Sequence, residues 1–417
     1  MSSMTKTQSL WRHRDFMLLW SGQSVSLIGS QVTVLALPLL AVTVLNAPTF
    51  NVGLLSTCST LPWLIVSLPA GVVVDRCRKR SVMLCCDLAR AVILVSVPVA
   101  SLFSALTLWQ LYAVALLSGT FAVFFNSAYL SFPATLLEKE QLVDANGKIS
   151  TASAIAGIAG PSLAGFLVGL IGAARAVTTD AFSYLASALT IFLVRHEEPA
   201  PERDRTVKRR FWPELLVGFR LIVASRSLVY ITFANSFGGF VVVAINSIWV
   251  PYAVRGLGWS AKAVGLVMGI SAVGGLVGSL LATRAIRRYG LPAVLLMAPI
   301  AFAPGELMAG LVGPGVWGQI VVTIGFGVTT GAVLLYNIAQ RSYRLQSCPR
   351  DQVGRLNSTV NWLQWGLRPL AGILAGGLGT LVGLRLVILV FASLLALCAV
   401  ALWASPLRGE FRSPAVA

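Results

Sequence analysis

Long apolar segments alternate with short polar segments along almost the whole chain. Twelve of the apolar segments are long enough to cross a bilayer, for which a helix needs about 20 apolar residues. In the first half of the chain they cover residues 18–45, 52–74, 82–103, 108–129, 149–171 and 176–194. In the second half they cover residues 228–250, 263–286, 291–312, 316–340, 356–382 and 384–403. The pattern predicts an all-α membrane protein with 12 transmembrane helices.

A long polar insertion divides the chain into two parts with six apolar segments each. Residues 195–226 contain eight Lys and Arg residues, and residues 213–224 have an amphipathic pattern with Pro213 suited to a helix start. The second half repeats the first, because a proline follows a polar loop at the same spacing in the fifth and eleventh segments. We expect two pseudo-symmetric six-helix halves, residues 1–194 and 227–417, joined by a cytoplasmic linker, residues 195–226.

Composition and charge distribution restrict the class of protein further. The 417 residues are 56% hydrophobic and 11% charged, and their mean hydropathy of +0.81 excludes a set of soluble domains. A net charge of +17 is compatible with nucleic-acid binding, but 27 of the 32 Lys and Arg residues fall on one side of the predicted topology. That asymmetry predicts a multi-pass protein of the cell (inner) membrane with both termini in the cytoplasm, and no nucleic-acid partner.

A densely charged loop separates the second apolar segment from the third. Its sequence runs from Gly71 through Asp75, Arg76 and Arg78 to Arg80, and it resembles the Gly-x-x-x-Asp-Arg-x-Gly-Arg-Lys/Arg motif of the major facilitator superfamily, with Arg78 in place of the second Gly. Gly71 permits close helix approach, and Asp75 can bridge to a basic partner in the other half. The loop is therefore predicted to brace one conformational state; the alternative is that its cations only anchor the topology.

The fifth apolar segment carries a strip of small residues next to a proline. Gly157, Gly160 and Gly165 allow another helix to lie close, and Pro161 bends the helix. This segment resembles the Gly-Pro-rich motif of antiporters in the same superfamily, and that resemblance implies export rather than uptake. The alternative is an ordinary small-residue packing seam.

Nearly the whole chain, about residues 15–405, resembles one branch of the superfamily, the drug:proton antiporters related to macrolide-efflux proteins and the enterobactin exporter. The residues that carry the resemblance are Trp20–Gln23, Ser26, Gly29, Asp75, Arg76, Ala145, Asn146, Gly160, Pro161, Asp180, Ala181, Gly218–Arg220, Gly354 and Arg355. The branch implies proton-coupled export of a hydrophobic or amphipathic small molecule such as a drug, a macrolide or a siderophore. The alternatives are uptake of a small nutrient and a non-transporting membrane sensor or scaffold.

Three acidic residues within the apolar segments are candidates for proton coupling. These are Asp180, Glu306 and Asp87, because a carboxyl group inside the membrane can take up and release a proton. Asp180 and Glu306 are expected near the outer face, where both could instead be solvated. Asp87 lies three residues before Arg90, so the two side chains are on neighbouring faces of one helix.

Polar and aromatic side chains in the apolar segments are candidates for substrate contact. They are Gln23, Gln31, Asn235, Trp365 and Arg368. Arg368 is the strongest candidate of these, because burying a guanidinium group inside a transmembrane helix without a partner has a high free-energy cost. Arg368 is expected to bind an anionic or carbonyl-bearing substrate, or to pair structurally with Glu306 or Asp180.

Several kinds of chemistry have no support in the sequence. It contains no nucleotide-binding Gly-x-x-x-x-Gly-Lys loop, no Cys and His set with the spacing of a zinc site, and no indication of a disulfide or an enzyme. We expect no cofactor and no metal. The expected partners are a small-molecule substrate, the proton gradient and the lipid bilayer, and the protein is expected to be a monomer.

Overall fold

The computed structural model describes residues 10–138, 141–196, 198, 211–348 and 352–412, and its regular elements in these ranges are helices. The helices before the linker are α1 (Arg14–Thr43), α2 (Thr49–Ile65), α3 (Ser67–Asp75), α4 (Lys79–Leu102), α5 (Leu108–Ser131), α6 (Pro133–Leu136), α7 (Leu142–Ile171) and α8 (Ala173–Phe192). The others are α9 (Phe211–Ala224), α10 (Arg226–Pro251), α11 (Ala261–Met297), α12 (Phe302–Leu311), α13 (Val316–Ser347), α14 (Val353–Val382), α15 (Leu384–Leu394), α16 (Ala396–Trp403) and α17 (Leu407–Arg412).

The observed helices differ from the predicted apolar segments in several places; for example, the segment 384–403 is divided into α15 and α16. The segment 52–74 is split into α2 and α3 at Val66, because Pro69 cannot donate a hydrogen bond to the carbonyl group of Ile65 and its ring crowds that group. The predicted eighth and ninth segments join into a single apolar stretch, Ala261–Leu311, in which only Gly290 has a positive φ, of 81°. Within the described residues, nine segments are long and apolar enough to cross a membrane.

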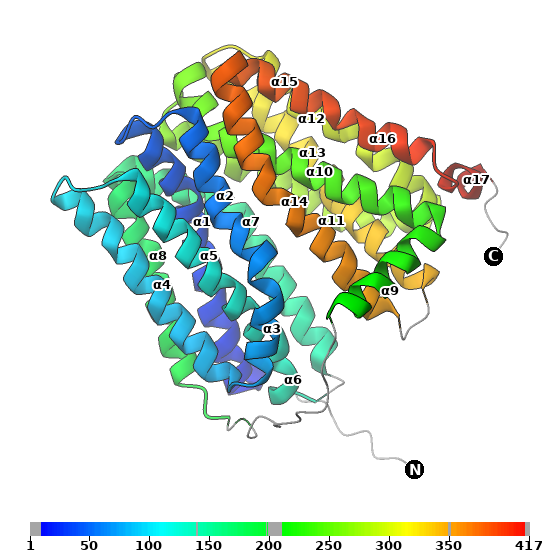
Figure 1. The fold of residues 1–417 in the computed structure, drawn as a ribbon, viewed down its shortest axis with the longest axis horizontal. Helices are drawn as coiled ribbons and strands as arrows, with labels where there is room; N and C mark the ends of the chain where they lie inside the picture. The colour runs from blue at the N-terminus through cyan, green and yellow to red at the C-terminus, as the bar shows by residue number, and fades with distance from the viewer. Residues whose placement is uncertain (1–9, 139–140, 197, 199–210, 349–351, 413–417) are drawn as a thin grey trace.

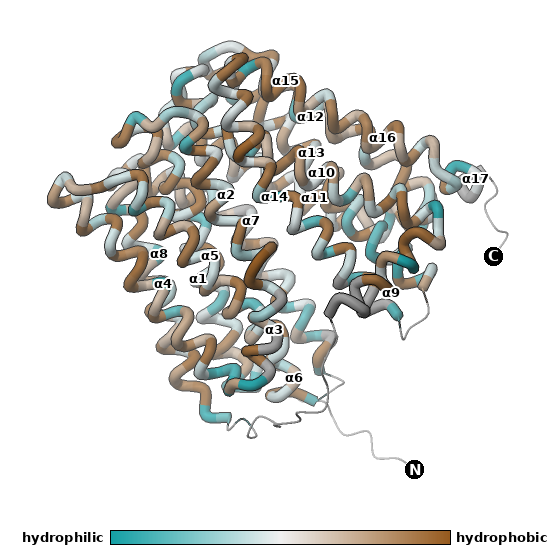
Figure 2. Tube along the Cα trace, viewed as in Figure 1, coloured by the Kyte–Doolittle hydropathy of each residue, from teal (hydrophilic) through white to brown (hydrophobic). Residues whose placement is uncertain are grey.

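The two ends of the helix bundle have different loops. One end, here called the basic end, carries the α3–α4 loop with Arg76 and Arg78, Arg80 in the first turn of α4, and also α6 and α9 (Figure 1). The other end, here called the turn end, has short connections with positive φ at Asn46, Ser104, Gly172, Gly258, Gly315 and Gly383. Figure 2 shows hydrophobic colour along the shafts of the helices and hydrophilic colour at the α3–α4 loop. Large apolar side chains such as Val92 and Phe182 are exposed on these shafts, as expected for contact with lipid.

Figure 1 shows helices α1–α8 gathered on one side and α9–α17 on the other. The two sets touch mainly where α2 lies along α14 and where α7 lies along α11. Toward the basic end the sets diverge, with α3 and α6 on one side and α9 on the other. The contact between the sets is therefore concentrated toward the turn end.

Glycines bring the two sets into direct backbone contact near the turn end. A Cβ atom added to Gly165 of α7 would collide with the backbone of Gly265 of α11, and one added to Gly53 of α2 would collide with the carbonyl oxygen of Gly372 of α14. Beside the second crossing, the Thr57 hydroxyl donates to the carbonyl oxygen of Pro369 at 2.7 Å. These close crossings hold the turn end shut.

Candidate functional site

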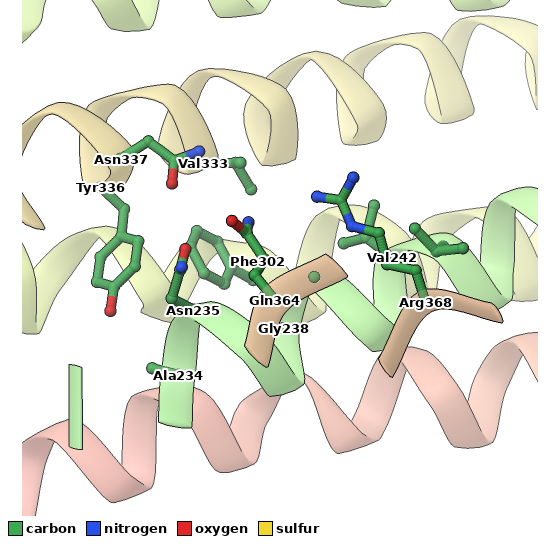
Figure 3. A pocket seen from close by; sticks show the side chains of 12 residues that line it. Ala234, Asn235, Gly238, Val242, Phe302, Val333, Tyr336, Asn337, Gln364 and Arg368 are labelled. Carbon is green, nitrogen blue, oxygen red and sulfur yellow. The ribbon is translucent and has the colours of Figure 1, made fainter. Parts of the chain in front are cut away.

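A cavity of about 180 Å³ lies among α10, α12, α13 and α14. Gln364 and Arg368 are four residues apart on α14, so both side chains lie on the same face of that helix. Gly238 and Gly239 of α10 face this part of the cavity. Gly239 has no side chain to fill it, and a Cβ atom built there would lie 3.7 Å from the Gln364 side chain. The lining consists of Ala234, Asn235, Gly238, Gly239, Val242, Val243, Phe302, Val333, Tyr336, Asn337, Gln364 and Arg368, and Figure 3 labels these residues except Gly239 and Val243.

The cavity combines apolar walls with amide groups. Figure 3 shows the amides of Asn235, Gln364 and Asn337 close together, with Arg368 separated from them along α14. The Tyr336 hydroxyl already donates to the carbonyl oxygen of Ile231 at 3.1 Å, so this phenol is engaged within the protein. A ligand therefore meets three amides and one guanidinium group as its polar partners.

Arg368 has no acidic partner among the described residues. Its guanidinium carbon lies 3.8 Å from the centre of the Trp365 ring, and its buried Nε atom has no hydrogen-bond partner within the described ranges. The predicted structural pairing with Glu306 or Asp180 is wrong, because the ion pairs of the described chain involve neither Arg368 nor Glu306 nor Asp180. The other prediction, that Arg368 binds an anionic or carbonyl-bearing substrate, stays a prediction; Arg368 lies in the cavity lining.

Trp365 connects the cavity to the other set of helices. Its ring stacks on that of Trp63 in α2, with 4.6 Å between the ring centroids and 19° between the planes. Arg368, Trp365 and Trp63 thus form a continuous stack from the cavity to the contact between α14 and α2. Sequence reasoning selected Trp365 and Arg368 but missed Trp63, which no local motif distinguishes from the other tryptophans.

A second buried polar cluster lies in the first set of helices. Asp87 and Arg90 of α4 form an ion pair, as their spacing suggested, and their exposed fractions are 0% and 6%. The Arg90 guanidinium also lies over two aromatic rings, 4.7 Å from the centre of Phe125 and 4.1 Å from that of Tyr184. This arginine is enclosed by the protein on several sides.

Asp180 of α8 belongs to the same cluster. It accepts hydrogen bonds from the hydroxyl groups of Thr33 in α1 and Ser183 in α8. Its exposed fraction is 0%, so the alternative that Asp180 is solvated is wrong. Tyr184, which covers Arg90, also shares a 2.9 Å hydrogen bond with Ser30. Two carboxyl groups and one guanidinium group are therefore buried together, here called the acid–arginine cluster (Asp87, Arg90 and Asp180).

Glu306 is a separate buried acid in α12. Its exposed fraction is 7%, so the solvated alternative is wrong here as well. The neighbouring Gly305 packs against Thr329 and Gly325 of α13, which draws α12 close to that helix. In the described part of the chain no Lys, Arg or His forms an ion pair with Glu306, which distinguishes it from the acid–arginine cluster.

The small-residue strip of α7 makes contacts at some of its predicted positions and not at others. A Cβ atom at Gly160 would collide with the side chain of Gln31, and Gly165 lies against Gly265 of α11. Pro161 is buried beside them. Nothing lies within 4 Å of a Cβ atom built at Gly157, so this position is not part of the close contact.

In the part of the chain that the structure describes, the charged loop makes no ion pair with the other set of helices. Nothing lies within 4 Å of a Cβ atom built at Gly71, and Arg76 and Arg78 are exposed. The side chain of Asp75 lies outside the described residues. Nearby, the backbone amides of Lys79 and Arg80 donate to the Glu198 carboxylate at 3.1 and 3.0 Å. Glu198 follows α8 in the chain, so these hydrogen bonds do not reach the other set of helices.

The two glutamines of α1 do not line the cavity. Gln31 packs on Gly160, and Gln23 has a buried side-chain oxygen without a partner among the described residues. Of the five predicted substrate-contact residues, the structure places Asn235 and Arg368 in the lining and Trp365 directly behind Arg368. In the described ranges no group of three or more His, Cys, Asp or Glu side chains is arranged to hold a metal ion.

The sequence profile of the Major Facilitator Superfamily matches residues 19–367. The chain belongs to this superfamily. Among its relatives is the multidrug efflux pump Tap of Mycolicibacterium fortuitum, 24% identical over 371 residues, which are 86% of this chain and 87% of Tap. Macrolide efflux protein A of Streptococcus pyogenes is 22% identical over 234 residues, which are 56% of this chain and 57% of that protein. The predicted resemblance to macrolide-efflux transporters is confirmed.

Solved structures of superfamily members have the same fold. The nucleoside transporter NupG superposes with a TM-score of 0.75 at 15% identity, over 94% of this chain and 98% of NupG. A bacterial homologue of the human lysosomal transporter Spinster gives a TM-score of 0.69 at 17% identity, over 94% of this chain and 96% of that one. At these identities the likeness establishes the fold and not the solute. The protein is thus a multi-pass membrane transporter of the superfamily.

Proposed function

We propose that this protein is a secondary active exporter, a proton-coupled antiporter, of a hydrophobic or amphipathic small molecule. The observation that carries the direction of transport is the Gly-Pro segment of α7, which lies at the crossing of the two sets of helices: Gly165 meets the backbone of Gly265, and Ser162 lies against Gly269. The resemblance of this segment to the antiporter motif and the names of the relatives, a multidrug efflux pump and a macrolide efflux protein, support export.

The proposal includes a topology of 12 transmembrane helices in two six-helix halves, residues 1–194 and 227–417. We assign α2 with α3, the two parts of the stretch divided at Gly290, and α15 with α16 to single bent spans, and α8 to a span of 20 residues. The concentration of Lys and Arg favours a cytoplasmic basic end in the inner membrane. On that assignment the two sets separate toward the cytoplasm, where an exporter collects its solute.

The brace is proposed for the opposite state. With the basic end open, Gly71 has no neighbour and Arg76 and Arg78 are exposed. When the basic end closes, this loop approaches the other half, and Asp75 becomes available to a basic partner there. Supporting this order of events, the turn-end crossings at Gly53 and Gly165 are already tight in the present structure.

The acid–arginine cluster is the proposed site of proton coupling. Asp87 and Asp180 bring two negative charges to one buried region, where Arg90 supplies a single positive charge. Because an uncompensated charge inside the membrane is costly, one added proton balances this cluster. Glu306 is the less supported candidate, because the described chain offers it no charged partner whose balance a proton would change.

Transport of a macrolide and of a second amphipathic drug into inverted membrane vesicles tests the proposal. An exporter takes up the drug when the vesicle interior is acidic, and a protonophore abolishes the uptake. The matched control is Asp144→Asn, which neutralises an exposed carboxyl group in the same half and should leave uptake unchanged. Uptake only in right-side-out vesicles would indicate an importer, and uptake that is insensitive to the protonophore would contradict proton coupling.

A further inference from the structure

We propose that the cavity formed by α10, α12, α13 and α14 selects an amphipathic solute through an anionic group, a carboxylate or a chemically similar oxyanion, bound by Arg368. The inference rests on the proposed export function, because it names the substrate class of the same cavity. It follows from the charge of the lining, the lack of a hydrogen-bond acceptor for Arg368 among the described residues, and the separate group of amides farther along the cavity.

The lining carries one charge, and that charge is positive. Among its 12 named residues only Arg368 is charged at neutral pH. The phenol of Tyr336 is neutral, and none of the 12 has a carboxylate. Asp87, Asp180 and Glu306 are all outside the lining. A cationic amine in this cavity would therefore meet an arginine of the same charge with no acid to offset it, whereas an anion would find a partner.

Within the described residues, Arg368 has an aromatic contact, and its Nε donor has no hydrogen-bond acceptor. A guanidinium group has five N–H donors, and the guanidinium carbon of Arg368 lies over the Trp365 ring, 3.8 Å from the ring centre. The buried Nε atom has no acceptor among the described residues, and Arg368 makes no ion pair there. A carboxylate can accept two parallel hydrogen bonds from the edge of such a group. The arginine is therefore oriented for a ligand.

The rest of the cavity fits the remainder of an amphipathic anion. Asn235, Gln364 and Asn337 provide amide donors and acceptors for further oxygen atoms. Phe302, Val242 and Val333 provide an apolar wall. The volume of about 180 Å³ is room for on the order of ten water molecules, which is enough for a carboxylate with a small ring system.

Three probes with one ring system and different charges test the selection. These are 2-naphthoate, its neutral methyl ester and the 2-naphthylmethylammonium cation. Equilibrium dialysis against the purified full-length protein in detergent, with protein-free micelles subtracted, gives each Kd. We expect naphthoate to bind at least about tenfold more tightly than the ammonium probe, as a charged hydrogen bond implies. Equal affinities, or a preference for the cation, would overturn the proposal.

Substitutions then assign the preference to one side chain. Arg368→Gln should remove the tenfold preference, and Arg368→Lys should keep part of it, because Lys keeps the charge but not the flat two-pronged donor. Arg287→Gln, which neutralises an exposed arginine of the same half, is the matched control and should bind like the wild type. A preference that survives in a monodisperse Arg368→Gln protein would overturn the proposal. If that variant aggregates, the ranking measured on the wild type still decides.

Transport by the same proteins separates this inference from the proposed function. In proteoliposomes, naphthoate binding without any proton-driven movement of naphthoate or drugs would refute export and leave the anion site standing. Proton-driven export of cationic drugs that is unchanged in Arg368→Gln would support export and refute the anion site. Loss of naphthoate transport in Arg368→Gln, with the control unchanged, is the result expected if both are correct.

Discussion

Arg90 and Arg368 both lie inside helices of the membrane region, but their surroundings differ. Arg90 is paired with Asp87 and covered by the rings of Phe125 and Tyr184, so that only 6% of it is exposed. Arg368 contacts one aromatic ring and faces a cavity without an acidic partner. Arg90 has an acidic partner within the protein, whereas Arg368 has none in the described chain and is left for a ligand. We infer that the two halves divide coupling and solute binding between them.

The largest expected effect comes from removing the enclosed arginine. Arg90→Gln leaves Asp87 and Asp180 buried without a cation, and we expect it to lower the free energy of unfolding by about 3–5 kcal/mol. Arg368→Gln breaks no ion pair and should cost less than about 1 kcal/mol. The temperature at which each purified variant loses its monodisperse chromatographic peak measures the difference. Equal losses would show that the two arginines have the same structural role.

Next in size is the effect on proton coupling. In Asp180→Asn or Asp87→Asn one carboxylate remains beside Arg90, so the cluster is balanced without an added proton. We expect the dependence of vesicle uptake on an acidic interior, about tenfold or more in the wild type, to disappear in both variants. Asp144→Asn provides the comparison. Full proton dependence in both cluster variants would exclude the cluster as the coupling site.

A moderate effect is expected where the two halves meet beside the cavity. Trp63→Leu removes the stack on Trp365, and an aromatic pair of this kind is worth about 0.5–1.5 kcal/mol. The maximal export rate should therefore change by about two- to tenfold, with unchanged stability in detergent. Trp317→Leu, at a tryptophan that is 80% exposed, is the control. The same rate in both variants would mean that the stack does not affect the conformational equilibrium.

The smallest effect is expected at the isolated acid. Glu306→Gln loses no ion pair in the described chain and removes a buried carboxyl group, so stability should stay the same or rise by up to about 1 kcal/mol. Proton-dependent uptake should persist in this variant. If Glu306→Gln lost proton-dependent uptake while Asp180→Asn kept it, proton coupling would belong to the second half and not to the first.

Hydrophobic patterning predicted most of the helices but not every interruption. Helices α1, α4, α5 and α13 start and end within a few residues of predicted segments, except that α13 continues to Ser347, past the apolar stretch. The break at Val66 was missed, because apolar residues continue on both sides of it. Its cause is the backbone chemistry of Pro69, which the hydropathy pattern does not register.

The site was predictable only where one helix carries the information. The Asp87–Arg90 pair follows from a spacing of three residues, but its association with Asp180 depends on how α4 and α8 pack. Asn235 and Arg368 stood out as polar groups in apolar segments, whereas Gln364 and Asn337 were missed. Their relevance depends on which helix face meets the cavity, and this is decided by contacts between segments distant in sequence.

The stack of Trp63 on Trp365 also gives the protein an internal optical reporter. Two indole rings 4.6 Å apart and within 19° of parallel interact strongly enough to couple their electronic transitions. That coupling contributes to the circular dichroism of the indole transitions, and the contribution is lost when the rings are apart. Because one ring belongs to α2 and the other to α14, separation of the two sets of helices along this contact would remove this contribution. The working cycle could then be followed without attaching a dye.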